Sequence, residues 1–253
     1  MSGMASTRRY HAAWHRWARF VAQRMVLRPV VYAVTKVSVL GTDNLDGLSG
    51  PFVVVANHSS HLDAPLLVTA LPRRYTRSLA VNAAADYFYR QWWMKAATSL
   101  FFNTYPVSRT NADMGKGKGL ANQLLSEKVP VVIFPEGTRR NTENGVKRFK
   151  PGAAALSITQ DVPCVPVAIV GTDEAMPVGR SWPVPGRPPV TLIVGAPINP
   201  EPGERVRDLN DRLEAQVAAM VATRDPNAKP DLTRHKARPD DHPSERAQKE
   251  EAS

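Results

Sequence analysis

Short apolar runs of strand length alternate with stretches of helical periodicity along most of the chain, and this alternation restricts the fold most. The expected strands are the runs 52–56, 78–83, 131–134, 164–170 and 190–194. Helical patterns lie between and after them, at 62–71, 86–97, 114–127, 152–160 and 205–223. Strands that alternate with helices are typical of layered α/β proteins rather than of β-sandwiches. We therefore expect an α/β fold.

Composition excludes several other classes of protein. Of the 253 residues, 43% are hydrophobic and 22% charged, which is ordinary for a folded protein and argues against wholesale disorder. A single cysteine, Cys164, excludes an internal disulfide framework and a multi-thiolate zinc site. No apolar run reaches eighteen residues, so we do not expect an ordinary spanning helix, and arginines interrupt every candidate secretion signal.

The formal net charge of +10 is concentrated at the N-terminus. Residues 1–36 hold seven of the 33 Lys and Arg residues and no acid, whereas the tail 224–253 has equal numbers of cations and acids. The tail is rich in Pro, Lys and Asp with almost no large apolar residue. We predict a helical membrane-associating segment at 1–38, an α/β domain at 39–223 and a charged disordered tail at 224–253.

The N-terminal segment is aromatic as well as basic. At helical spacing an apolar stripe forms from Tyr10, Trp14, Trp17, Val21 and Met25, and the opposite side carries Arg8, Arg9, His15, Arg16 and Arg19. Arginines and indole rings on one amphipathic helix suit an anionic membrane surface. Two alternatives stay open: a helix packed on its own domain with a solvated basic face, and a nucleic-acid arm, which we do not expect. We also expect Pro29 to break or kink this helix.

The first segment that carries chemistry follows the strand at 52–56. His58 lies just past the strand end, where α/β domains place their clefts, and Asp63 is five residues further on. An imidazole can take a proton from an alcohol, and a carboxylate can orient it. The two side chains meet only if the chain turns between them. The alternative is that Asp63 merely caps the following helix and His58 is an ordinary loop histidine.

The sequence offers candidate residues for two other types of ligand, a metal ion and a phosphate. His58, His61 and Asp63 could ligate a metal, but no other His or Cys cluster offers further ligands, so we predict no metal and no cofactor. The segment 115–119, Gly-Lys-Gly-Lys-Gly, could cradle a phosphate, but it lacks the ending of a nucleotide-binding loop. A solvated loop is the favoured interpretation there.

Three further segments carry candidate binding residues. Gly137 permits a tight turn whose N–H groups can bind an anion, and Arg139 offers a planar fork that matches phosphate. Arg109 follows an aromatic run, and on its own it is weak evidence for a binding site. Pro163 and Pro166 restrict the strand at 164–170 to an edge or an irregular entry into the sheet.

In this order and at this spacing, the blocks resemble the four motifs of the glycerolipid acyltransferase family, above all its 1-acyl-glycerol-3-phosphate acyltransferases. The blocks are His58-x-x-x-x-Asp63, Arg109, Phe134-Pro-Glu-Gly-Thr-Arg139 and Val162-Pro-x-Val-Pro166, and Phe149-Lys-Pro-Gly152 also fits. The resemblance covers about residues 40–200. It implies a single layered domain with a central mixed β-sheet flanked by helices, as in glycerol-3-phosphate acyltransferases.

The resemblance also implies roles for residues. His58 would be the general base and Asp63 its orienting partner. The glycerol-phosphate end of the acceptor would be bound by Arg109, Glu136, Gly137, Thr138 and Arg139. The sequence departs from the usual pattern at Arg140-Asn141 and at Ser108, which affects acceptor preference and leaves the reaction class unchanged.

We therefore expect an enzyme that moves an acyl group from acyl-CoA or acyl carrier protein, as co-substrate, to the sn-2 hydroxyl of lysophosphatidic acid. Glycerol-3-phosphate or another lysophospholipid as acceptor, or a non-catalytic lipid-binding protein, are the alternatives. Direct attack by the acceptor needs a base and no nucleophilic side chain, and the chain has no Gly-x-Ser-x-Gly elbow. The expected location is peripheral, on the cytoplasmic face of the cell membrane.

Overall fold

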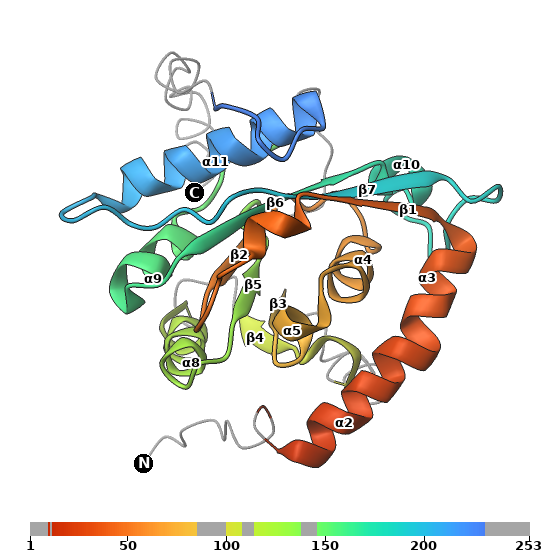
Figure 1. The fold of residues 1–253 in the computed structure, drawn as a ribbon, viewed down its shortest axis with the longest axis horizontal. Helices are drawn as coiled ribbons and strands as arrows, with labels where there is room; N and C mark the ends of the chain where they lie inside the picture. The colour runs from red at the N-terminus through yellow and green to blue at the C-terminus, as the bar shows by residue number, and fades with distance from the viewer. Residues whose placement is uncertain (1–9, 11, 85–99, 108–113, 138–145, 231–253) are drawn as a thin grey trace, which may run out of the picture.

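The computed structural model describes residues 10, 12–84, 100–107, 114–137 and 146–230. Within them the chain forms a seven-stranded sheet in the order β1-β7-β6-β2-β5-β3-β4 (Figure 1). The strands are β1 (Lys36–Leu40), β2 (Val53–Ala56), β3 (Ala80–Ala84), β4 (Tyr105–Val107), β5 (Val131–Ile133), β6 (Cys164–Val170) and β7 (Pro189–Val194). β7 is antiparallel to β6 and parallel to β1, whereas the five strands from β6 to β4 are mutually parallel. The expected mixed sheet is confirmed.

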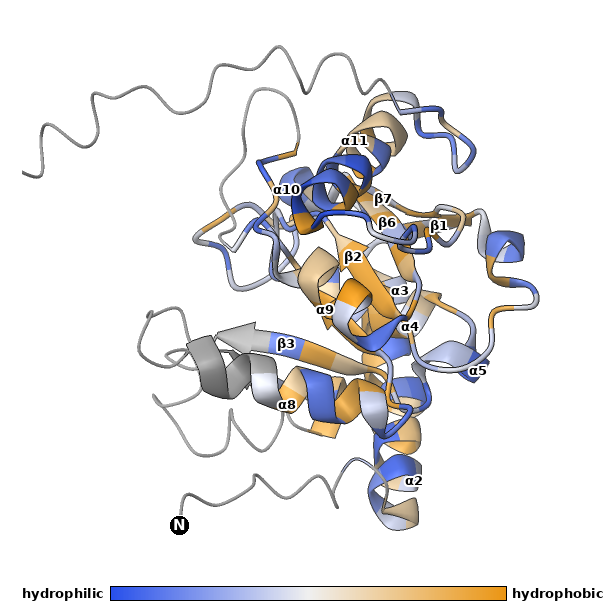
Figure 2. Cartoon of the chain, turned by 90° about the vertical axis from the view of Figure 1, so that its left-hand side faces the viewer, coloured by the Kyte–Doolittle hydropathy of each residue, from blue (hydrophilic) through white to orange (hydrophobic). Residues whose placement is uncertain are grey.

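Helices cover both faces of the sheet. One face packs against α8 (Met114–Ser126), α9 (Gly152–Gln160) and α11 (Val206–Thr223). The other packs against α3 (Arg28–Val34), α4 (Asp63–Ala70), α5 (Arg73–Thr76) and α10 (Thr172–Ala175), as Figure 1 shows. All four residues of β2 are apolar and buried, as expected for a parallel strand covered on both sides, and β2 is hydrophobic along its length in Figure 2.

Of the two alternatives for the strand at 164–170, an edge position or an irregular entry into the sheet, the edge position is wrong. β6 lies inside the sheet, between β7 and β2. The carbonyl of Pro166 accepts a hydrogen bond from the N–H of Gly195, one residue beyond Val194, the last paired residue of β7. The nitrogen of Pro166 faces the same side, since N and O of one strand residue point the same way. Pro166 therefore removes no hydrogen-bond donor from the ladder between β6 and β2.

Helical backbone runs without interruption from Ala13 to Val34, through α2 (Ala13–Val21), the π-helical segment η1 (Ala22–Leu27) and α3. Arg28, just before Pro29, keeps helical dihedral angles, with φ −64° and ψ −50°. Of the break or kink expected at Pro29, the break is therefore wrong. Proline clashes with the carbonyl four residues earlier in an α-helix, and the wider π-helical turns before it relax that spacing.

The first half of this helix contacts the domain through polar side chains, whereas Leu27, Val31 and Tyr32 further along pack on the core. Arg19 is only 3% exposed and donates to Oδ1 of Asn103 at 2.6 Å, and Gln23 donates to the carbonyl of Phe101 at 2.6 Å. Trp14 and Trp17, each 68% exposed, lie on the outer side together with Met25. Arg19 turns toward the domain and Trp14 and Met25 turn away from it, so the part of this face that packs on the domain is basic.

Some expectations concern segments at the margin of what the structure describes. Tyr10 leaves the predicted stripe, because it is buried and its hydroxyl donates to the carbonyl of Thr104 at 3.2 Å. Lys36 begins β1, so the last residues assigned to the N-terminal segment pair with β7. The helix expected at 86–97 lies outside the described residues, and so does the tail predicted at 224–253 from residue 231 onward. The solvated loop favoured at 115–119 is wrong, because these residues lie in α8. No helix of the described part is long and apolar enough to cross a membrane.

Candidate active site

Three neighbouring parallel strands, β6, β2 and β5, bring the candidate site together at their carboxyl ends (Figure 1). His58 follows β2, Glu136 follows β5, and Thr172 follows β6 at the start of α10. Because parallel strands end at one edge of the sheet, residues more than a hundred positions apart in the chain become neighbours there.

The imidazole of His58 forms a hydrogen bond to the carboxylate of Asp63. Its Nδ1 lies 2.8 Å from Oδ2 of Asp63, which is fully buried, whereas the His58 side chain is 21% exposed. An ionised carboxylate only accepts, so Nδ1 carries the hydrogen and Nε2 keeps its lone pair. His58 also stacks on the ring of Phe134, with centroids 4.3 Å apart. The imidazole is held in one orientation with Nε2 available to accept a proton.

The chain turns between the two residues, as their pairing requires. The N–H groups of Ser59 and Ser60 each donate to Oδ2 of Asp63 at 2.8 Å, and the hydroxyl of Thr172 donates to Oδ1 at 2.5 Å. No side-chain cap bond is present at the start of α4. The carboxylate therefore points back into the loop rather than capping the helix, and its donors offset much of the cost of burying it.

Two more hydrogen-bonded contacts fix this loop to the sheet. The Asn57 side-chain amide exchanges two hydrogen bonds with the backbone of Ile169 in β6, at 2.8 and 2.7 Å. The hydroxyl of Ser60 donates to the carbonyl of Met176 at 2.7 Å. Since both ends of the loop are bonded to the segment around α10, the position of His58 depends on that segment.

Glu136 supports the site from the side of β5. Its carboxylate, 7% exposed, accepts from the backbone N–H of His58 at 3.2 Å. Burial raises the pKa of Glu136 to about 7, and the His58 N–H and the positive charge of Lys147 oppose that rise. In this structure Glu136 therefore contacts the loop that carries His58.

Gly137 forms a tight turn in the same region. Its φ of +72° favours glycine, and its N–H donates to the carbonyl of Phe134 at 3.3 Å. A Cβ there would lie 3.0 Å from Nζ of Lys150, whose ammonium thus lies over the turn. The backbone N–H of Lys150 donates to the carbonyl of Pro135 at 3.0 Å, which holds the two segments together. A cation therefore lies beside the turn expected to bind an anion.

The remaining expectations can be placed only in part. Arg109, Thr138 and Arg139 lie outside the described residues. Cys164 is buried in β6 and burial raises the pKa of its thiol to about 12, which makes it a poor nucleophile at neutral pH. Among the described residues, no three His, Cys, Asp or Glu side chains are grouped to hold a metal ion.

The site defines a class of protein: an α/β domain that holds an oriented imidazole at the carboxyl ends of its parallel strands. The sequence model of the Acyltransferase family matches residues 36–170, and the chain belongs to this family. The fold resembles that of the 1-acyl-sn-glycerophosphate (LPA) acyltransferase PlsC from Thermotoga maritima, with a TM-score of 0.63 at 23% identity over 92% of this chain and 88% of that one.

Curated relatives carry a common name. The chain is 30% identical over 190 residues to a 1-acyl-sn-glycerol-3-phosphate acyltransferase of Chlamydomonas reinhardtii, covering 74% of this chain and 53% of the relative. It is 34% identical over 125 residues to the human 1-acyl-sn-glycerol-3-phosphate acyltransferase alpha, covering 48% of this chain and 41% of the relative. The chain thus spans about half the length of the curated relatives that it matches.

Sequence reasoning missed two residues of this site. Thr172 follows Gly171 at an unremarkable strand end, and no spacing links it to Asp63, 109 positions earlier. Lys150 belongs to the Phe-Lys-Pro-Gly block that the resemblance included, but no role had been assigned to it. A search for polar residues after every predicted parallel strand would have found Thr172.

Replacing Thr172 with Val removes the donor to Oδ1 of Asp63 and keeps the side-chain shape. We expect turnover at saturating substrate to fall about tenfold with little change in KM, because the orientation of the base is impaired and substrate contacts are not. We expect a loss of about 1–3 kcal/mol in the free energy of unfolding. Thr172→Ser should restore both, and Thr159→Val, at an exposed hydroxyl, is the matched control. Equal turnover in the Val and Ser variants would contradict the role.

Replacing Glu136 with Gln should change how stability depends on pH. The folded protein binds the Glu136 proton more tightly than the unfolded chain, so this group destabilises the fold increasingly as pH rises from about 4.5 to about 7. Relative to wild type, Glu136→Gln should gain up to about 3 kcal/mol in unfolding free energy between pH 4.5 and 8. Denaturant unfolding at several pH values measures this, and parallel curves for the two proteins would refute it.

Proposed function

We propose that this chain transfers a fatty acyl group from acyl-CoA, or from acyl carrier protein, to the sn-2 hydroxyl of lysophosphatidic acid, which yields phosphatidic acid. The observation that carries the proposal is the 2.8 Å bond between Nδ1 of His58 and the buried carboxylate of Asp63, which leaves Nε2 available. The names of the relatives from Chlamydomonas reinhardtii and human support the choice of acceptor.

In the proposed reaction Nε2 of His58 takes the proton of the acceptor hydroxyl as its oxygen attacks the thioester carbonyl. The tetrahedral intermediate then expels the thiolate, which receives that proton from the imidazolium, so the base is regenerated. The carboxylate of Asp63 stabilises the imidazolium and keeps its orientation. Cys164, whose thiol is buried, does not form an acyl-enzyme in this scheme.

The proposed acceptor site lies at the turn of Gly137, with Arg109, Thr138 and Arg139 assigned by resemblance. The ammonium of Lys150 beside Gly137 supports an anion at this place. Glu136 then acts in this scheme by holding the backbone of His58. The same arrangement would serve glycerol-3-phosphate or another lysophospholipid, because every such acceptor presents a phosphate and a hydroxyl.

The test is thiol release from oleoyl-CoA by purified protein, with and without lysophosphatidic acid, and identification of the product by mass. We expect acceptor-dependent release that yields phosphatidic acid. His58→Ala should lower the rate at least about 100-fold, because the general base is lost. His61→Ala, at an exposed histidine of the same loop, is the matched control and should keep the wild-type rate.

Two results would contradict this proposal. Equal turnover by His58→Ala would remove the assigned base. Thiol release at the same rate with and without any acceptor would indicate a thioesterase in place of a transferase. Repeating the assay with glycerol-3-phosphate and with an acyl carrier protein donor would separate the alternatives for acceptor and donor.

We further propose that the enzyme attaches peripherally to the cytoplasmic face of the cell membrane through α2 and η1. Trp14, Trp17 and Met25 are exposed on the outer face of this helix, at 68–70% of their surface. Tryptophans grouped with other apolar side chains on an exposed helix face are typical of interfacial helices.

Replacing Trp14 and Trp17 together with Ser should weaken binding to anionic vesicles at least about tenfold, since the two rings supply most of the apolar area that would enter the membrane. Acyl transfer to detergent-dispersed acceptor should change less than twofold. Vesicle sedimentation and the detergent assay measure the two effects. Trp182→Ser, at another exposed tryptophan, is the control. Unchanged vesicle binding by the double variant would contradict the attachment.

A further inference from the structure

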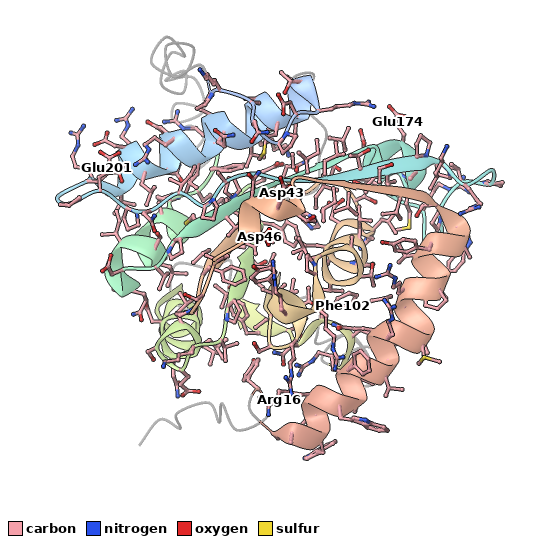
Figure 3. All side chains as sticks on the ribbon, viewed as in Figure 1. Arg16, Asp43, Asp46, Phe102, Glu174 and Glu201 are labelled. Carbon is pink, nitrogen blue, oxygen red and sulfur yellow. The ribbon has the colours of Figure 1, made fainter. Side chains whose placement is uncertain are left out.

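A cavity of about 300 Å³ lies between the N-terminal helix and α5, and four arginines contribute to its lining. Arg16 and Arg19 enter it from α2, Arg73 from α5, and Arg77 follows directly after α5. Figure 3 shows Arg16 on the side of α2 that faces the body of the domain. Among the described residues that line this arginine cavity, none is acidic.

The arginine cavity lies far from the candidate active site in the architecture of the sheet. α5 joins α4 to β3 and therefore lies at the amino ends of the parallel strands, whereas His58 follows the carboxyl end of β2. Arg19 donates to Asn103, which in turn donates to the carbonyl of Ser78 just before β3. The cavity thus lies at the edge of the sheet opposite His58.

Four guanidinium groups around one small space repel one another unless an anion joins them. Nε of Arg16 is buried and finds no hydrogen-bond partner among the described residues. Arg73 is positioned by stacking over the ring of Phe20, with Cζ 3.8 Å from the centroid. A guanidinium held by such contacts is a preorganised donor, and its planar fork matches the oxygens of a phosphate group.

We propose that the arginine cavity binds the phosphate group of an anionic phospholipid while the acyl chains of that lipid stay in the membrane. This inference rests on the proposed attachment through α2. Trp17 connects the two features, because it lines the cavity and is also 68% exposed on the face proposed to enter the membrane. A headgroup that reaches the cavity would therefore leave its chains beside the tryptophans.

The experiment compares two double variants that lose the same charge. Arg16→Gln/Arg77→Gln removes cavity donors, and Arg24→Gln/Lys36→Gln removes exposed cations of the same N-terminal segment. Binding is measured by sedimentation with phosphatidylcholine vesicles that contain about 30% phosphatidylglycerol. We expect the cavity variant to bind at least about tenfold more weakly than wild type, and the surface variant to lose about twofold. Binding to pure phosphatidylcholine should be equal in all three proteins.

Thermal unfolding separates a lost site from a damaged fold. The cavity variant should keep or raise the Tm of wild type, because two of the four mutually repelling arginines are neutralised. Soluble dihexanoyl phosphatidylglycerol should raise the Tm of wild type and of the surface variant but not of the cavity variant. If inorganic phosphate raises the wild-type Tm as much as the lipid does, and only when the cavity arginines are present, the ligand is the free anion and the lipid assignment is overturned.

The experiment distinguishes a failure of the arginine cavity from a failure of the proposed membrane attachment through α2 and η1. If wild type binds the vesicles and both double variants lose affinity equally, the arginine cavity is refuted as a site and the attachment through Trp14 and Trp17 stands. If wild type does not bind vesicles at all, the attachment and the cavity fail together. The acyl-transfer rate on detergent-dispersed acceptor, measured on the same preparations, should be unchanged in both variants.

Discussion

The buried carboxylate of Asp63 is the interaction on which the geometry of the site depends. A fully buried charge is tolerated only where donors surround it, and here four donors do so, from His58, Ser59, Ser60 and Thr172. Three of these donors belong to the loop after β2 and the fourth to α10. The loop has to adopt the one conformation that turns all of them inward. Orientation of the imidazole therefore follows from a requirement of folding.

The order of the strands explains how short loops can bring these donors together around Asp63. β2 lies between β6 and β5, so the loop that carries His58 has the end of one parallel strand on each side. Asn57 bonds it to β6 and Glu136 supports it from β5. Each support comes from the residues immediately after a buried apolar strand. The hydrophobic core thus sets the positions of the polar groups around His58. All of these supports come from the carboxyl ends of the strands.

Much of the fold could be predicted because the signals are local. The run 164–170 and the helix at 152–160 were placed with their observed bounds, since apolar periodicity and the flanking Gly and Pro residues mark both. β4, with Pro106 at its centre, gives no such signal, and neither does β1, whose residues alternate between exposed and half-buried at the sheet edge. Likewise the His58–Asp63 pair lies within one short segment and could be predicted, whereas Thr172 joins it only through tertiary structure. The edge position expected from Pro166 is wrong because its nitrogen faces the side of β7 at the point where the ladder with β7 ends. Only the tertiary structure shows this.

The N-terminal helix shows why charge composition alone describes a surface poorly. Its seven-cation segment accounts for most of the net charge, yet Arg19 is buried against Asn103, and Arg28 donates to the carbonyl of Thr69 at 3.2 Å. Those cations attach the helix to its own domain, and Arg16 turns inward to the cavity. The outer face is left to Trp14, Trp17 and Met25. An ordinary amphipathic helix packs its apolar face on the core. The first half of this helix has the reversed orientation and is held by polar contacts, whereas α3 packs Val31 on the core in the ordinary way. Under the proposed attachment, a bilayer would cover the exposed tryptophans.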